Sequence, residues 1–209
     1  MGNVKLSVIY YSSTGTGTEI ANALVAEAEA AGAEVRLRKA PELAPDAAID
    51  ANPAWRANLE ATRSVPDVAA EDVVWADAVI FGSPTRYGNI AAQLKQFIDT
   101  LGGEWQQGLL ADKVYSGFTS SATKHGGQES TLLALYNTIH HFGGIIVSPG
   151  YTDAIMFATG NPYGVSHVDG QGTIPISDET RQAARFAGQR VAGVAAQLTA
   201  GRDAALAAC

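Results

Sequence analysis

The feature that most constrains this chain lies at residues 4–18. An apolar, β-branched run over residues 4–11 leads directly into a loop of serine, threonine and glycine, and a helical apolar pattern begins at Ile20. This order predicts a strand, a short hydroxyl-rich loop and the N-terminus of a helix. Backbone N–H groups, hydroxyls and the positive end of the helix dipole converge on one anion at such a junction. Because the loop contains no lysine, it is not a nucleoside-triphosphate P-loop.

Strand and helix patterns alternate along the rest of the chain. We predict helices at residues 18–31, about 90–101, about 132–139 and from Ser177 or Asp178 onward, the last with Ala183, Ala187, Val191, Val194 and Leu198 on its inner face. We predict strands at residues 4–11, 34–39, 78–82, 113–119 and 145–148. Such an order is typical of an α/β fold with a doubly wound, five-stranded parallel sheet and helices on both faces.

The predicted elements belong to one domain over residues 1–198. Two long segments, about 40–70 and 149–176, read as irregular loops, and residues 199–209 read as a C-terminal tail. A chain of 209 residues is long enough to bury a full core.

Composition restricts the possible partners and the compartment. The net charge of −7 argues against nucleic acid, which is bound through lysine and arginine. The single cysteine is Cys209, so an internal disulfide framework and a cysteine-based metal site are not expected.

No paired carboxylates accompany the loop histidines, and no metal site is predicted. Since no apolar run is long enough for an integral membrane segment and no signal peptide is evident, we expect a cytoplasmic protein.

Two more loops resemble the first in position and character. Residues 84–89 follow the third predicted strand, and residues 120–126 follow the fourth. In a doubly wound sheet the ligand lies beyond the carboxyl ends of the strands, where these loops meet. The first loop suits a phosphate, and the other two suit a flat heteroaromatic ring. The predicted cofactor-binding residues are Ser12, Ser13, Thr14, Gly15, Thr16, Gly17, Pro84, Thr85, Arg86, Tyr87, Gly88, Asn89, Ser120, Ser121, Ala122, Thr123, Lys124, His125 and Gly126.

A dinucleotide-binding Rossmann site is an alternative interpretation of the first loop. Gly15 and Gly17 match the first two glycines of that fingerprint, but the third glycine is absent. The second predicted strand ends in basic residues instead of an acidic one, which an NADP-type site tolerates.

Four segments carry a family resemblance. They are DAVIFGSPTRYGN (residues 77–89), GGEW (102–105), SSATKHGGQE (120–129) and GNPYG (160–164). Together they resemble the WrbA-type NAD(P)H:quinone oxidoreductases of the flavodoxin-like superfamily. The resemblance extends over residues 4–198 and implies a flavodoxin-like fold.

The resemblance implies FMN as the cofactor, with its phosphate at residues 12–17 and its ring between residues 84–89 and 121–126. It also implies a homotetramer in which neighbouring subunits help to wall the active site. By the same resemblance, Trp105 and Thr14 occupy substrate-binding positions, although the family often has an aromatic residue where Thr14 stands. His141 occupies a catalytic position near the flavin, and a one-residue shift in this region makes His140 its competitor.

The expected activity is the transfer of two electrons from NADH or NADPH to quinones by a ping-pong mechanism. Two other functions remain open at this point. A flavodoxin-type one-electron carrier would use the same phosphate loop, and a non-catalytic partner-binding flavoprotein would need the cofactor without turnover.

Overall fold

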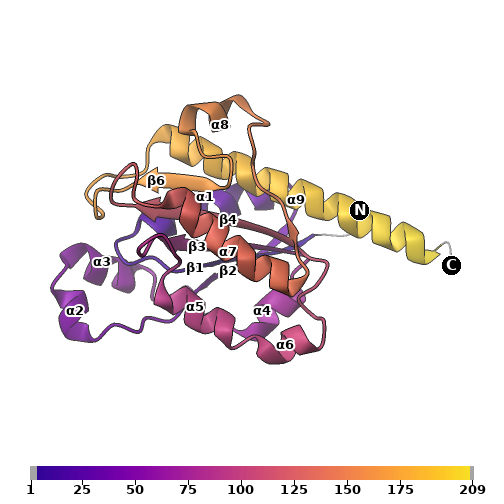
Figure 1. The fold of residues 1–209 in the computed structure, drawn as a ribbon, viewed down its shortest axis with the longest axis horizontal. Coiled ribbons are helices and arrows are strands. Elements are labelled where there is room, and N and C mark those ends of the chain that lie inside the picture. The colour runs from indigo at the N-terminus through magenta and orange to yellow at the C-terminus, as the bar shows by residue number, and fades with distance from the viewer. Residues whose placement is uncertain (1–3, 208–209) are drawn as a thin grey trace.

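A six-stranded parallel sheet forms the centre of the molecule in the computed structural model, which describes residues 4–207 (Figure 1). Its order is β2-β1-β3-β4-β5, and β6 also pairs with β4. The five-stranded order confirms the predicted doubly wound sheet. Cys209, the single cysteine, lies outside the described residues. The strands are β1 (Lys5–Tyr10), β2 (Glu34–Lys39), β3 (Ala78–Pro84), β4 (Val114–Ser121), β5 (Ile145–Ile146) and β6 (Val165–Val168).

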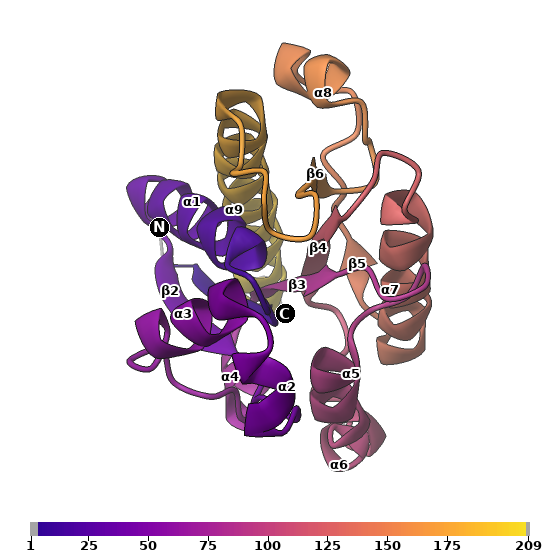
Figure 2. The same cartoon turned by 90° about the vertical axis from the view of Figure 1, so that its left-hand side faces the viewer.

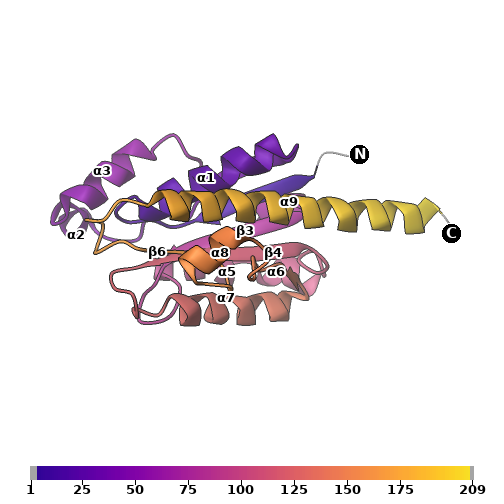
Figure 3. The same cartoon turned by 90° about the horizontal axis from the view of Figure 1, so that it is seen from above.

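Helices cover both faces of the sheet (Figures 2 and 3). On one face α1 (Thr16–Ala30) and α9 (Asp178–Ala207) pack against Leu6 and Val8 of β1. On the other face α4 (Ala70–Trp75), α5 (Ala92–Asp99) and α7 (Gln128–Phe142) share a core with Ile9. Since helices cover both faces of the sheet, every residue of β3 and β4 is buried, as is usual for central parallel strands.

The strand register brings the three predicted loops to one edge. Tyr10 of β1 pairs with Gly82 of β3, and Gly82 pairs with Phe118 of β4. The sheet order reverses between β1 and β3, since β2 lies on the outer side of β1. A crevice forms at such a reversal beyond the carboxyl ends of the strands.

The segment at residues 40–70 is not the irregular loop that we predicted. It contains α2 (Asp46–Asp50) and α3 (Pro53–Ala61), and α4 begins at its end. The signal for α3 was present in the sequence, because the Asn52 side chain accepts hydrogen bonds from the N–H groups of Ala54 and Trp55, and Pro53 occupies the first helical position.

The prediction of a loop over residues 149–176 was also wrong. This segment contains α8 (Ala154–Thr159), capped by the Asp153 side chain, and β6. β5 pairs with Val114 and Tyr115, whereas β6 pairs with β4 from Phe118 onward. Two short strands therefore share one edge of β4, and the strand predicted at 145–148 covers only Ile145–Ile146.

The last helix is capped by Ser177, whose hydroxyl accepts a hydrogen bond from the N–H of Thr180. α9 does not stop at Leu198 but continues to Ala207, so residues 199–207 are helical and residues 201–207 are exposed. The remaining described helix is α6 (Gly102–Gln106). Within residues 4–207, no helix has both the length and the apolar character required to cross a bilayer.

We expect Gly188→Ala to destabilise the protein. A Cβ at Gly188 would lie 2.5 Å from the Leu24 carbonyl oxygen, so α9 and α1 would have to separate. Such overpacking costs roughly 1–3 kcal/mol of unfolding free energy. Gly193→Ala is the matched control on the same helix, because nothing lies within 4 Å of its Cβ. Alanine there should raise the unfolding free energy by about 0.5–1 kcal/mol. Urea unfolding measures both, and equal stability of the two variants would contradict this packing.

Candidate functional site

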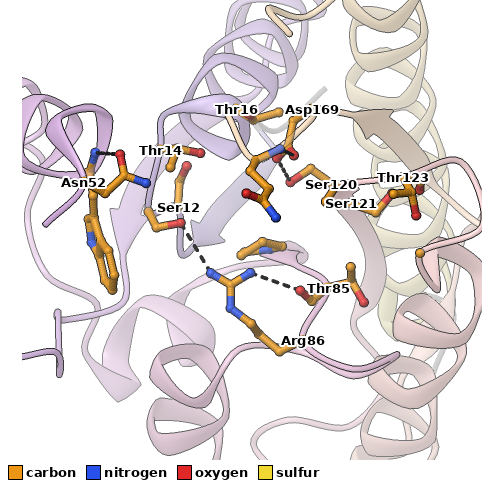
Figure 4. A pocket seen from close by; sticks show the side chains of 16 residues that line it. Ser12, Thr14, Thr16, Asn52, Thr85, Arg86, Ser120, Ser121, Thr123 and Asp169 are labelled. Carbon is orange, nitrogen blue, oxygen red and sulfur yellow. Dashed lines mark hydrogen bonds between the residues drawn. The ribbon is translucent and has the colours of Figure 1, made fainter. Parts of the chain in front are cut away.

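A cavity of about 380 Å³ opens at the carboxyl ends of β1, β3 and β4 (Figure 4). Its volume is in the range of small-molecule sites. The three predicted loops all contribute to its wall. The predicted cofactor-binding residues that line it are Ser12, Ser13, Thr14, Thr16, Pro84, Thr85, Arg86, Ser120, Ser121, Ala122, Thr123 and Gly126.

The first loop ends in a helix N-terminus that faces the cavity. α1 begins at Thr16, two residues earlier than predicted, and Gly15 precedes it with a φ of 99°, which favours glycine. The N–H of Gly15 donates to Ser12 Oγ at 3.2 Å. The N–H groups of the first helical turn have no partner within the helix. A Cβ at Gly17 would lie 3.2 Å from the Tyr11 carbonyl oxygen, so a larger residue would crowd this turn.

The second loop brings a positive charge to the cavity. The Arg86 guanidinium donates to the Thr85 carbonyl at 3.0 Å and to Ser13 Oγ at 3.4 Å, which connects the first two loops. Among the described residues that line the cavity, Arg86 is the only cation. The Thr85 hydroxyl accepts from the N–H of Gly88 and bonds the Thr131 hydroxyl at 2.7 Å, which fixes the loop to α7.

The third loop contributes hydroxyls, and a buried carboxylate lies beside it. Ser121 Oγ donates to the Thr123 carbonyl at 2.7 Å and accepts from the Gln128 amide. Ser120 Oγ donates to Asp169 Oδ2 at 3.0 Å. Asp169 follows β6, is 7% exposed and lines the cavity.

Sequence reasoning missed four residues of the cavity wall. Asn52 and Trp55 come from the segment predicted as a loop, and Asp169 and Gln171 come from the second such segment. The Asn-Pro pair at residues 52–53 could have revealed α3, as described above. We find no pattern in the sequence that could have placed Asp169, because the position of β6 depends on the edge that β5 leaves free.

Several predicted residues lie next to the cavity but do not line it. Gly15 and Gly17 shape the first turn of α1 from behind, and Tyr87 is fully exposed with a φ of 54°. The others that do not line it are Gly88, Asn89, Lys124 and His125.

Trp105 and His141 line a different cavity, of about 310 Å³. Trp105 Nε1 donates to the His141 carbonyl at 2.8 Å, and Trp105 is 53% exposed. His141 lies 13 residues after Gln128, which begins α7 beside the first cavity, so about 20 Å of helix separates it from that site. His140 is exposed in the same last turn. The folded chain does not bring these residues to its own first cavity.

The fold and the cavity define a flavodoxin-like protein, and the comparison with known proteins identifies its family. Residues 4–156 match the family model of the NADPH-dependent FMN reductases, and the chain belongs to this family. It is 46% identical over 93% of its length to an NAD(P)H dehydrogenase (quinone) of Deinococcus radiodurans, of which 97% is covered. It is 42% identical over 95% of its length to the NAD(P)H dehydrogenase (quinone) of Geotalea daltonii, which is covered completely.

Solved structures agree with this assignment. A WrbA-like flavodoxin from Agrobacterium tumefaciens aligns with a TM-score of 0.66 at 27% identity, covering 93% of this chain and 99% of that chain. A flavodoxin from the domain Archaea aligns with a TM-score of 0.58 at 16% identity, covering 92% of this chain and 99% of the other, and supports the fold alone. The resemblance to the WrbA-type proteins is confirmed.

The cavity residues fit the chemistry of FMN. The helix N-terminus and the hydroxyls of the first loop suit a phosphate, and no carboxylate stands among residues 12–18. Asp169 is an acceptor-only group, which suits the hydroxyls of a sugar-like chain and opposes a phosphate. The cavity wall therefore carries one cationic side chain, Arg86, and one carboxylate, Asp169, which favour different parts of a ligand. Among residues 4–207 no group of three His, Cys, Asp or Glu is placed to hold a metal ion.

We expect Ser12→Asp to weaken FMN binding by about 100-fold. Aspartate retains the acceptor for the Gly15 N–H but adds a negative charge where the phosphate would lie, and like charges a few ångströms apart near a surface repel by several kcal/mol. Ser12→Asn is the neutral control of nearly the same shape and should lose far less affinity. Fluorescence titration of FMN into the apoprotein measures both. Equal affinities of the two variants would contradict a phosphate site here.

Proposed function

We propose that this chain is a cytoplasmic FMN-dependent oxidoreductase that transfers two electrons from NADH or NADPH to quinones. The observation that carries the proposal is the cavity where a helix N-terminus and two polar loops meet at the reversal of the sheet. The relatives named NAD(P)H dehydrogenase (quinone), similar over nearly the whole chain, support the same activity.

Each part of the cavity has a role in this proposal. The N-terminus of α1 binds the FMN phosphate through Ser12, Thr14 and Thr16, and the loops after β3 and β4 hold the ring. Asp169 accepts hydrogen bonds from the ribityl chain, and the Arg86 charge favours electron density on the ring. When bound, FMN would supply the redox chemistry that passes a hydride equivalent, two electrons and one proton, from NAD(P)H to a quinone, and the second proton of the hydroquinone would come from solvent.

In this proposal the two substrates alternate at one side of the ring. One continuous cavity of about 380 Å³ supports this order, in which the oxidised nicotinamide nucleotide leaves before a quinone reaches the same side of the ring. The alternatives use this space differently. A one-electron carrier meets protein partners at the exposed edge of the cofactor, and a partner-binding flavoprotein needs no substrate exchange.

We expect ping-pong kinetics with NADH and benzoquinone. Double-reciprocal plots at several quinone concentrations should give parallel lines, because product release separates the two half-reactions. Intersecting lines would show that both substrates bind together.

A dithionite titration distinguishes the alternatives. A stable blue one-electron form would favour the flavodoxin-type carrier, and FMN binding without NADH oxidation would favour the partner-binding protein.

We infer further that the active site is completed in a homotetramer. Trp105 and His141 form an exposed, partly apolar surface about 20 Å of helix away from the FMN cavity of their own chain. In an assembly this surface can wall the cavity of a neighbouring subunit. Trp105 then contacts the substrate, and a histidine near the flavin comes from the same neighbour.

We expect two inactive variants to restore activity when mixed. At an FMN concentration that saturates only the wild-type cavity, Ser12→Asp subunits stay largely without FMN but keep Trp105, and Trp105→Ala subunits bind FMN but lack the wall. Co-refolded assemblies then contain sites with both parts intact, about a quarter of the total for equal amounts with one donor and one acceptor chain per site. Quinone-dependent NADH oxidation measures the recovery. A mixture that is no more active than its components would contradict a site shared between subunits.

A further inference from the structure

Trp55 places an aromatic face on the cavity wall. Among the described residues that line the cavity, it is the only aromatic one. It comes from α3, which follows β2 and stands apart from the loops after β3 and β4. An aromatic face in a polar cavity provides a stacking surface for a planar ring.

The indole is held in place by a carboxylate. Trp55 Nε1 donates to Glu42 Oε2 at 2.8 Å. The Tyr11 hydroxyl donates to the same oxygen at 2.9 Å, and the Gln93 amide donates to Oε1 at 2.8 Å. Burial opposes ionisation of Glu42, but the hydrogen bonds from Ala44, Gln93, Trp55 and Tyr11 outweigh it, and the pKa of the carboxyl lies below its ordinary value. Glu42 is therefore an anion at neutral pH that orients the ring.

A second anchor fixes α3 to the phosphate loop. Asn58 Nδ2 donates to the Ser12 carbonyl at 2.8 Å, and the Thr18 hydroxyl donates to Asn58 Oδ1 at 2.9 Å. Since Asn58 lies one helical turn after Trp55, the indole is positioned relative to the phosphate site before any ligand binds.

Asn52 adds a polar group beside the aromatic face. Its Oδ1 caps α3 by accepting from the N–H groups of Ala54 and Trp55. Within residues 4–207, its Nδ2 has no hydrogen-bond partner, and the residue lines the cavity. An aromatic face with an adjacent amide suits a purine, which stacks on the ring and offers acceptor nitrogens at its edge.

The position of Trp55 and Asn52 in the cavity indicates which ring, the flavin or an adenine, they would bind. Figure 4 shows Asn52 on one side of Ser12 and Ser120, Ser121 and Thr123 on the other. The flavin ring belongs with the latter group, and a hydride donor must place its nicotinamide on that ring. The far half of the dinucleotide then extends past Arg86, whose guanidinium suits the pyrophosphate, towards α3.

We propose that Trp55 and Asn52 form a binding site for the adenine ring of the electron donor. The inference rests on the proposed function and assigns a recognition role to α3, a helix that flanks the reaction site. Adenine stacks on the indole, and the Asn52 amide donates to a purine nitrogen. The site makes the enzyme selective for a dinucleotide over the corresponding mononucleotide.

The test compares NADH with reduced nicotinamide mononucleotide, which lacks the adenosine. Trp55→Leu should raise the KM for NADH by about 10-fold or more, as expected for the loss of one base–aromatic stack, and leave kcat nearly unchanged. Its kinetics with the mononucleotide and its affinity for FMN should match the wild type. Trp75→Leu is the matched control, since Trp75 stacks on Arg36 and does not line the cavity.

A binding measurement tests the site without turnover. AMP added to the FMN-loaded protein should quench tryptophan fluorescence in the wild type and in Trp75→Leu but not in Trp55→Leu. Asn52→Asp retains the cap of α3 but loses the amide donor, so it should weaken AMP binding without changing thermal stability.

The outcomes separate this inference from the proposed function. If the wild type oxidises neither donor, the proposed function fails. If it oxidises both donors and Trp55→Leu changes neither KM, the adenine site alone is overturned. A large loss of FMN affinity in Trp55→Leu, with AMP quenching unaffected, would also overturn it, because the indole would then serve the cofactor.

Discussion

The unpaired N–H groups at the start of α1 are the constraint on which the rest of the site depends. They lie at the reversal of the sheet order between β1 and β3, where the chain leaves a crevice, and the helix dipole favours a negative acceptor there. The loop before them is made of small hydroxyl residues, and Gly15 adopts a left-handed conformation to open the turn. Carboxylates are absent from residues 12–18, and among the described residues that line the cavity Asp169 is the only one with a carboxylate.

The segments outside the minimal α/β pattern complete this crevice. α3 attaches to the phosphate loop through Asn58, and its Trp55 faces the cavity. On the other side β6 extends the edge of β4 and delivers Asp169 next to Ser120. Two segments outside the minimal pattern therefore add Asn52, Trp55, Asp169 and Gln171 to the wall of the phosphate-binding crevice.

The sequence was sufficient for the parts of the fold that repeat a local pattern. The sheet, α1 and the three loops follow from strand-to-helix transitions, and most of the predicted loop residues line one cavity. It was insufficient where tertiary contacts decide. The helices of residues 40–70 are only five and nine residues long, and β6 pairs with β4 beyond the two residues that pair with β5. Trp55 reaches the site through α3, whose start the Asn-Pro pair at residues 52–53 does signal, whereas Asp169 reaches it through β6, which no local pattern could place.

The two cavities also differ in chemistry, which bears on how the site is completed. The first is lined mainly by hydroxyls, amides and one charge of each sign, and its one aromatic side chain lies on α3. The second cavity lies at the C-terminal ends of α5 and α7. It is lined by the apolar side chains of Ile98, Leu101 and Phe142 and by Trp105, which is half-exposed. A half-exposed indole on such a surface is typical of residues that gain burial on association. Among the described residues, the polar cavity has a single aromatic side chain in its wall, and the second cavity joins apolar side chains to an exposed indole. The two surfaces are therefore complementary in chemistry, which is the physical argument for a site that a neighbouring chain completes beside the residues that one chain provides.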